Sequence, residues 1–242
     1  MIKESKVSKY LIYAIGEIVL VVIGILIALQ INNWNESQKD IRLEQTFLIK
    51  LKSNLQDDSA LYKDRIEQNM KIYNHLDTSL TILKNYTSFT TEDLQKHLRY
   101  IMFFHRFNTN KTTFDNLLSS GRLDVIRNDS ITQELFLYYR EISQNQESLA
   151  ESIDAYSRNT FGPSLLEFDF IENSLDYFSK PMKSSFDLKP LQSYVENPTI
   201  VNHITYKMLL IKTIVNAYKR QITNAERIIN RIDKELKLFK YD

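Results

Sequence analysis

Apolar residues form an uninterrupted run near the start of the chain. Residues 10–29, YLIYAIGEIVLVVIGILIAL, contain a single charged side chain, Glu17. A helix of this length rises about 30 Å, the thickness of the hydrocarbon layer of a bilayer. A cleaved signal peptide has a shorter apolar stretch that ends at a small-x-small site, whereas this run continues into Gln30 and a polar segment. The pattern therefore predicts a transmembrane signal-anchor helix over residues 10–30.

Beyond the span, apolar residues recur at helical spacing in two long stretches. The first covers residues 41–83, and no glycine or proline separates it from the span, although the polar stretch NNWNES is a candidate joint. The second begins after Asn197 and Pro198, a helix start signal. It forms a heptad seam that alternates by three and four: Met208, Ile211, Val215, Tyr218, Ile222, Ala225, Ile229, Ile232, Leu236 and Phe239. We expect the two stretches to pair within one chain, with pairing between copies as the alternative.

Shorter helices are expected between these two stretches. Capping residues and breakers predict helices over about 90–104, 112–120 and 129–160, the last one stopped by Gly162 and Pro163. Residues 163–197 are expected to form an ordered connection with short helices. Glycine and proline number four each, which favours long helices over sheets and tight hairpins.

The predicted fold is all-α: one N-terminal transmembrane helix followed by an antiparallel helical bundle with long helices. The division is a tail over residues 1–9, the span over 10–30 and one bundle domain over 31–242. The chain has no cysteine, which excludes disulfides, zinc–thiolate sites and thiol catalysis. Its formal net charge is +1, so no global field favours nucleic acid.

The charges that flank the span predict its orientation. Lys3, Lys6 and Lys9 precede it against one acid, Glu4, while the first cations on the other side lie beyond residue 38. By the positive-inside rule, the N-terminus is cytoplasmic and the bundle lies across the membrane. The expected location is a bacterial inner membrane with a periplasmic bundle. Three aromatic residues are placed as interfacial anchors: Tyr10, Tyr13 and Trp34.

One stripe of the span combines an acid with small residues. At 3.6 residues per turn, Glu17, Gly24 and Ala28 fall within about 20° of one direction. Small residues let two helices approach closely, and an intramembrane carboxyl avoids lipid by facing protein or water. The stripe therefore predicts a helix–helix interface. Two alternatives remain: a proton-coupled role for Glu17, or a carboxyl group that is protonated or reaches water with little consequence.

The sequence contains no recognisable catalytic or metal-binding motif. The four histidines lack the i, i+4 spacing of a helical metal pair, so neither a metal site nor a cofactor site is expected. The sequence SSGRLDVIRND places Arg122 and Arg127 at a turn where they are candidate contacts for an anion. Asp124 and Asp129 are competing internal partners for these arginines. No nucleophile–base pair, phosphate-binding loop or pair of catalytic carboxylates is recognisable.

Two segments resemble a known family. The N-terminal motif YAIGEIVLVVIGILIALQINNWNE is similar to the N-terminus of uncharacterised bacterial single-pass membrane proteins that share a domain of unknown function. Residues 112–139, TTFDNLLSSGRLDVIRNDSITQELFLYY, resemble a second recurring element of that family. The resemblance implies a single-pass inner-membrane protein with a helical extramembrane region, and it assigns no catalytic or ligand residues.

The expected function is contact rather than catalysis. We expect a non-enzymatic scaffold or accessory subunit of an inner-membrane assembly, whose partners are the bilayer and either further copies of the chain or another membrane protein. The first alternative is a periplasmic ligand-sensing bundle that signals through a membrane partner. The second is a stator-like element that uses the intramembrane Glu17.

Overall fold

The computed structural model describes residues 4–165 and 190–239, and all regular secondary structure in these two ranges is helical. The predicted all-α class is confirmed. The long elements are α1 (Glu4–Lys84), α4 (Asp129–Glu141), α5 (Glu147–Tyr156) and α8 (Pro198–Leu238). The short helices are α2 (Thr91–Leu98), α3 (Thr112–Ser119), α6 (Gly162–Leu165) and α7 (Leu191–Val195). Short 3-10 helices form η1 (Tyr86–Ser88), η2 (Arg99–Met102) and η3 (Leu123–Val125). Single π-helical turns form η4 (Ile142–Gln146) and η5 (Ser157–Phe161).

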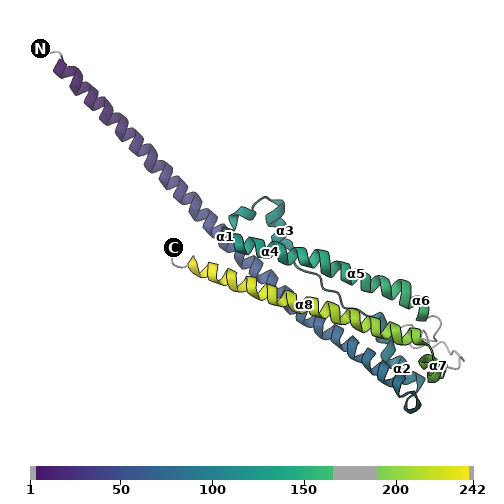
Figure 1. Ribbon diagram of the computed structural model, residues 1–242. Helices are drawn as coiled ribbons and strands as arrows, with labels where there is room; N and C mark the ends of the chain where they lie inside the picture. Colours follow the sequence, from purple (N-terminus) through teal and green to yellow (C-terminus); the bar gives the residue numbers. More distant parts are fainter. Residues whose placement is uncertain (1–3, 166–189, 240–242) are drawn as a thin grey trace, which may run out of the picture.

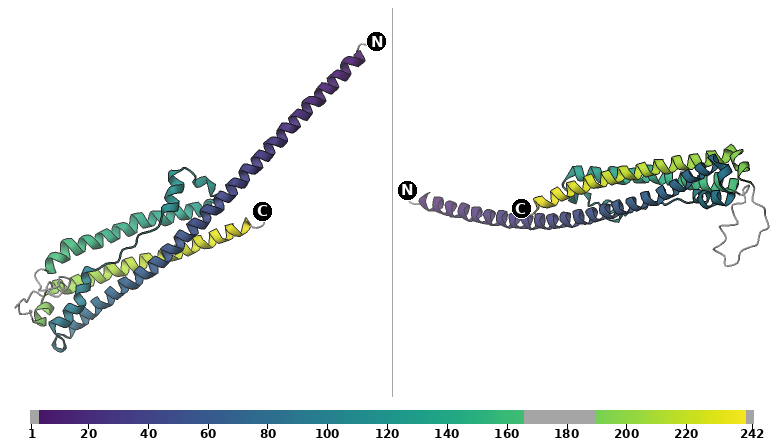
Figure 2. Two further views of the ribbon diagram at one scale, coloured as in Figure 1. Left: turned by 180° about the vertical axis from the view of Figure 1, so that it is seen from behind. Right: turned by 90° about the horizontal axis from the view of Figure 1, so that it is seen from below.

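Helix α1 is a single continuous helix of 81 residues. Its N-terminal part projects alone from the rest of the molecule, as Figures 1 and 2 show. The candidate joint at residues 32–37 is helical and exposed, so the helix is not broken there. Asparagine and serine lower helix propensity by at most about 0.7 kcal/mol per residue relative to alanine, and residues 25–84 contain no glycine or proline.

The bundle is formed by the C-terminal half of α1, the α4–α5 segment and α8, which lie side by side (Figures 1 and 2). Helix α8 is antiparallel to α1. Lys52 Nζ of α1 lies 2.5 Å from Asp233 Oδ1 near the C-terminal end of α8, while the ring centroids of Tyr62 and Tyr218 are 5.1 Å apart nearer its middle. The described end of α8 therefore lies on the side of the bundle from which the span emerges.

Helix α8 begins as its sequence predicts. The Asn197 side chain accepts a hydrogen bond from the Thr199 backbone N–H, and Pro198 occupies the first turn. The heptad seam packs within the chain, and the most extensive contacts of α8 are with α1. Buried neighbours beside the seam widen the packed face: Ile204, Ile214, Gln221 and Ile228.

Residues 103–128, here called the return path, lead back along α1 from η2 to α4. Thr90 and Asp93 form a capping box at the start of α2, and Gly121 has φ +64°, the left-handed conformation expected just after α3. Between η2 and α3, residues 103–111 adopt no helix and run back along α1. The helix expected over about 90–104 thus ends slightly early, at Met102.

The predicted stop at Gly162 and Pro163 is wrong for the helical segment that begins with α4. The chain passes through two π turns, η4 and η5, and continues as α6 to Leu165. In η5 the Gly162 backbone N–H bonds to the Ser157 carbonyl, five residues back. This wider turn restarts the helix, so that Pro163 stands in a first turn, where its missing N–H costs little. Most of the connection expected over 163–197 lies outside the described residues; α6 and α7 are its described helices.

Candidate functional site

The N-terminal part of α1 is long and apolar enough to cross a membrane, with a mean hydropathy of 2.7 over its most apolar window. None of that window is buried within the molecule, and Tyr10, Tyr13 and Trp34 are likewise exposed. A Cβ built on Gly24 has no atom within 4 Å. The stripe of Glu17, Gly24 and Ala28 is thus uncovered by any described part of the chain, and it lies on one side of α1 as the helical spacing requires.

The two arginines at the turn after α3 have different surroundings. The Arg127 backbone N–H donates to Glu44 Oε1 at 2.8 Å, and its guanidinium Nε lies 3.3 Å from Oε2 of the same carboxylate. Arg127 therefore has an internal partner on α1, at a position that the local sequence did not indicate. Arg122 is exposed on the turn. The ion pair with Glu44 accounts for Arg127, and Arg122 is left as the candidate anion contact.

A line of buried polar side chains on α1 is a feature that the sequence reading missed. Glu44, Asn54, Asp58 and Asn69 are each at most 8 % exposed and face the return path of residues 103–128. Asn69 pairs with the backbone of His105 in both directions: its Oδ1 accepts from the N–H at 3.1 Å and its Nδ2 donates to the carbonyl at 2.9 Å. These side chains supply hydrogen-bond partners for backbone groups of the return path, which an extended segment cannot supply for itself.

Asp58 is the centre of this line. Its carboxylate accepts hydrogen bonds from Thr109 Oγ1 at 2.6 Å, the Asn110 backbone N–H at 2.9 Å and Tyr138 Oη at 3.1 Å. Burial raises the pKa of Asp58, and the three donors oppose that rise. A carboxyl group held in this way joins α1, the return path and α4.

A cavity lies beside this centre, at η4. Tyr62 Oη donates to Gln146 Oε1 at 3.0 Å, and the Tyr62 ring stacks on Phe107 with centroids 3.5 Å apart. Gln146 is 4 % exposed and its Nε2 has no hydrogen-bond partner. It lines a cavity of about 210 Å³ whose other lining residues are both apolar and charged: Phe107, Ile142, Tyr218, Arg106, Glu147 and Glu151 among them. A hollow with a lining of this kind can hold water or a small polar molecule.

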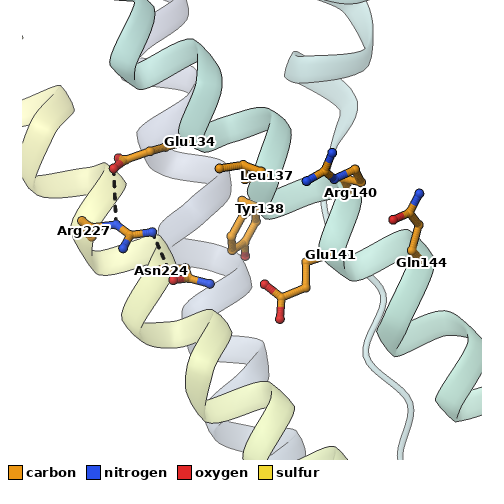
Figure 3. Close-up of a pocket in the computed structure, with 8 residues that line it drawn as sticks. All are labelled: Glu134, Leu137, Tyr138, Arg140, Glu141, Gln144, Asn224 and Arg227. Carbon is orange, nitrogen blue, oxygen red and sulfur yellow. Dashed lines mark hydrogen bonds and ion pairs between the residues drawn. The ribbon is translucent and has the colours of Figure 1, made fainter.

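A second hollow lies between α4 and α8, with a volume of about 440 Å³. Figure 3 shows that it is lined by residues of both signs, with Glu134 bonded across the helices to Arg227. Arg231 Nε lies 3.1 Å from the same Glu134 carboxylate. Because Glu134 of α4 is paired with two arginines of α8, the clearest role of this groove is to hold these helices together.

Buried polar groups also lie at the far end of the bundle. Lys207 is fully buried, its Nζ donates to Ser157 Oγ at 3.0 Å, and burial lowers its pKa to about 8. Ser157 Oγ in turn donates to the Ile153 carbonyl at 2.9 Å. A nucleophilic serine gives its proton to a base, whereas here that proton is directed to a backbone carbonyl and the lysine acts as donor. The pair as arranged is structural.

His203 links α8 to α5 and α6. Its Nδ1 contacts Tyr156 Oη and its Nε2 lies 3.3 Å from Ser164 Oγ. Ser164 Oγ donates to the Thr160 carbonyl at 3.0 Å, so its proton is also directed to the backbone. Within residues 4–165 and 190–239, no three His, Asp or Glu side chains are grouped in a way that could hold a metal ion.

The fold and these groups define an all-α protein with one helix long and apolar enough to span a membrane and a bundle joined by buried polar contacts. The chain belongs to a family of unknown function, DUF6090, whose model matches residues 17–159. That match covers most of the span, the bundle half of α1, the return path and α4–α5. No curated protein and no solved structure matches the chain.

The raised pKa of Asp58 gives a pH-dependent prediction. A carboxyl group whose pKa is higher in the folded than in the unfolded protein contributes stability below its ordinary value of 3.8, and that contribution is lost as the pH rises through the folded pKa. We expect the free energy of unfolding of wild type, minus that of Asp58→Asn, to decrease by up to about 1.4 kcal/mol per pH unit through this interval.

The measurement is urea unfolding of the full-length protein in detergent, followed by circular dichroism at a series of pH values from 4 upward. Glu44 and the other carboxylates are present in both proteins, so the difference isolates Asp58. A difference that is constant with pH, or that grows as the pH rises, would show that the buried carboxylate is not destabilised by its surroundings.

Proposed function

We propose that this protein is a membrane-anchored, non-enzymatic scaffold or accessory subunit of a bacterial inner-membrane assembly. The observation that carries the proposal is the unbroken course of α1, which has an uncovered apolar surface at one end and the bundle core at the other. A helix that joins both parts without a break transmits any pairing of spans to the bundles attached to them. Two spans that pair in the membrane would therefore also hold their bundles side by side.

The stripe of Glu17, Gly24 and Ala28 supports the membrane half of this proposal. Transfer of a carboxyl group into lipid is costly, and a neighbouring helix that approaches across Gly24 and Ala28 can accept or donate a hydrogen bond at Glu17. The cations before the span support a cytoplasmic N-terminus and a periplasmic bundle. In this arrangement the bundle is held off the membrane by residues 31–43 of α1, which are mostly exposed and form about 20 Å of helix.

A cysteine-free chain allows a direct test of this interface by disulfide cross-linking in native membranes. Gly24→Cys and Ala28→Cys lie on the proposed stripe, and Leu26→Cys, about 180° away on the helix, is the matched control. We expect oxidation to give cross-linked dimers for the first two variants and little product for the third. Glu17→Gln should preserve the cross-link, because an amide still forms hydrogen bonds, and Glu17→Val should weaken it.

Equal cross-linking at all three positions would contradict a defined interface. Absence of any cross-linked product for Gly24→Cys would argue against pairing of two copies, and co-purification of a second membrane protein that depends on the same stripe would then assign the surface to that protein. Absence of both would reject the scaffold function.

The cavity at η4 favours a second candidate, a ligand-sensing bundle. The cavity is lined by Arg106, Glu147 and Glu151 as well as by the rings of Phe107 and Tyr218, a lining that suits a small polar molecule with an apolar part. Ile142 and Gln146 belong to a π turn, a feature that often accompanies functional sites. A bound molecule there would contact α8 through Tyr218 and the return path through Phe107.

Thermal unfolding of the full-length protein with amino acids, monosaccharides and short carboxylic acids as probes tests this candidate. A ligand at about 100 times its Kd adds about 2.7 kcal/mol of stability, which is easily measured. We expect a positive probe to stabilise wild type and Gln144→Leu, whose side chain is exposed on the same turn, but not Gln146→Leu. If no probe stabilises wild type, or if Gln146→Leu responds equally, the sensing function is rejected.

A further inference from the structure

The stripe of Glu17, Gly24 and Ala28 does not end with the span. Alternating steps of four and three residues continue it along α1 through six further positions, here called the α1 seam: Ile31, Asn35, Gln38, Arg42, Gln45 and Ile49. At 3.6 residues per turn, Ile31, Asn35 and Ile49 fall within about 40° of the direction of Glu17. Because α1 is unbroken over this stretch, the stripe and the α1 seam form one continuous line.

The apolar residues at the two ends of the α1 seam are exposed. The side chain of Ile31 is 62 % exposed and that of Ile49 is 57 % exposed, whereas Leu48, next to Ile49, is fully buried in the bundle. The part of α1 that carries Ile31 projects alone from the molecule (Figure 2). A single exposed isoleucine is ordinary on a protein surface. Two that continue the line of the stripe mark one side of α1 that no described element packs against.

We propose that two copies of this chain pair in parallel along the α1 seam, in a short left-handed coiled coil that begins at the span and ends at Ile49. The proposal rests on the proposed function, because it names a second copy as the partner of the stripe. Steps of three and four residues keep one line facing a partner helix when the two helices wind around each other left-handed. In a parallel pair, each seam residue lies opposite its own counterpart.

The chemistry of the α1 seam favours a second copy over a different partner. An amide carries both donors and acceptors, so two Asn35 side chains that face each other can bond mutually, and asparagine in a seam determines register and the number of strands. Gln38 and Gln45 have the same capacity. Arg42 is the unfavourable position, since it meets its own charge. Its side chain is exposed and long enough to turn that charge toward water.

The membrane supplies what this polar seam lacks. Two isoleucines per copy bury far less area than a stable interface between free proteins requires. Pairing of the spans, however, raises the effective concentration of one α1 seam for the other. The coil ends where the bundle begins, because the next step along the line is Lys52, whose Nζ lies 2.5 Å from Asp233 Oδ1 of α8.

The test is disulfide cross-linking of the full-length protein in native membranes. Asn35→Cys and Ile49→Cys lie on the α1 seam, and the matched controls Ser37→Cys and Lys50→Cys are exposed positions about 160° and 100° away on the helix. We expect at least fivefold more cross-linked dimer from the seam variants than from their controls. In the Ile49→Cys protein at neutral pH, Asn35→Asp should reduce the cross-link severalfold, because it opposes two carboxylates, and Ser37→Asp should leave it unchanged.

Comparison with the span separates this proposal from the proposed function. Cross-linking at Gly24→Cys without cross-linking at Asn35→Cys and Ile49→Cys would overturn the α1 seam and leave the scaffold function standing, because the helices would then diverge beyond the membrane. Equal product from seam and control variants would also overturn it, as would an equal effect of Asn35→Asp and Ser37→Asp. Absence of product at every position, those in the span included, would reject pairing of two copies altogether.

Discussion

Helix α1 presents three kinds of surface along one unbroken backbone. Its first part presents apolar side chains on every side, its middle is exposed to water, and its last part contributes the central face of the bundle. Because a helix bonds its own backbone throughout, the proposed passage from lipid to water to protein leaves no backbone polar group unsatisfied. The positions of α8, of α4–α5 and of the return path all follow from the face that α1 offers them.

The return path shows how closely the bundle depends on this face. Residues 103–111 have no helix of their own, and unpaired buried backbone groups cost about 1–3 kcal/mol each. Asn69 and Asp58 supply partners for them from α1. The same surface therefore mixes leucines that exclude water with polar groups that determine where the extended segment lies. Such directional contacts select one arrangement where apolar packing alone would tolerate several.

Much of the architecture followed from periodicity in the sequence. The apolar run, the seam of α8 and the caps at Thr90 and Asn197 act over a few residues, so each was visible locally. The prediction for Pro163 was wrong because no local sequence motif announces the π turn that precedes it. That turn places the proline where a helix tolerates it.

The polar contacts inside the bundle were beyond a local reading. Asp58 and Tyr138 are 80 residues apart, and His75 and His97 are 22 apart, so nothing in the spacing of either pair announces that they meet. One local signal did exist. Asp58 and Asn69 occupy the same helical face as the buried leucines of α1, where a polar residue is unexpected unless it has a partner.

The central claim is that α1 is one rigid helix from the span into the bundle. A distance measurement across the stem, which is residues 31–43 between span and bundle, tests it most directly. Spin labels on Asn32→Cys and Lys50→Cys flank the stem on the same side of the helix, 18 residues apart. For the full-length protein in lipid nanodiscs, we predict a narrow distance distribution centred near 27 Å, from a rise of about 1.5 Å per residue. A broad distribution, or one centred at a clearly shorter distance, would show that the stem bends or unwinds and that span and bundle move independently.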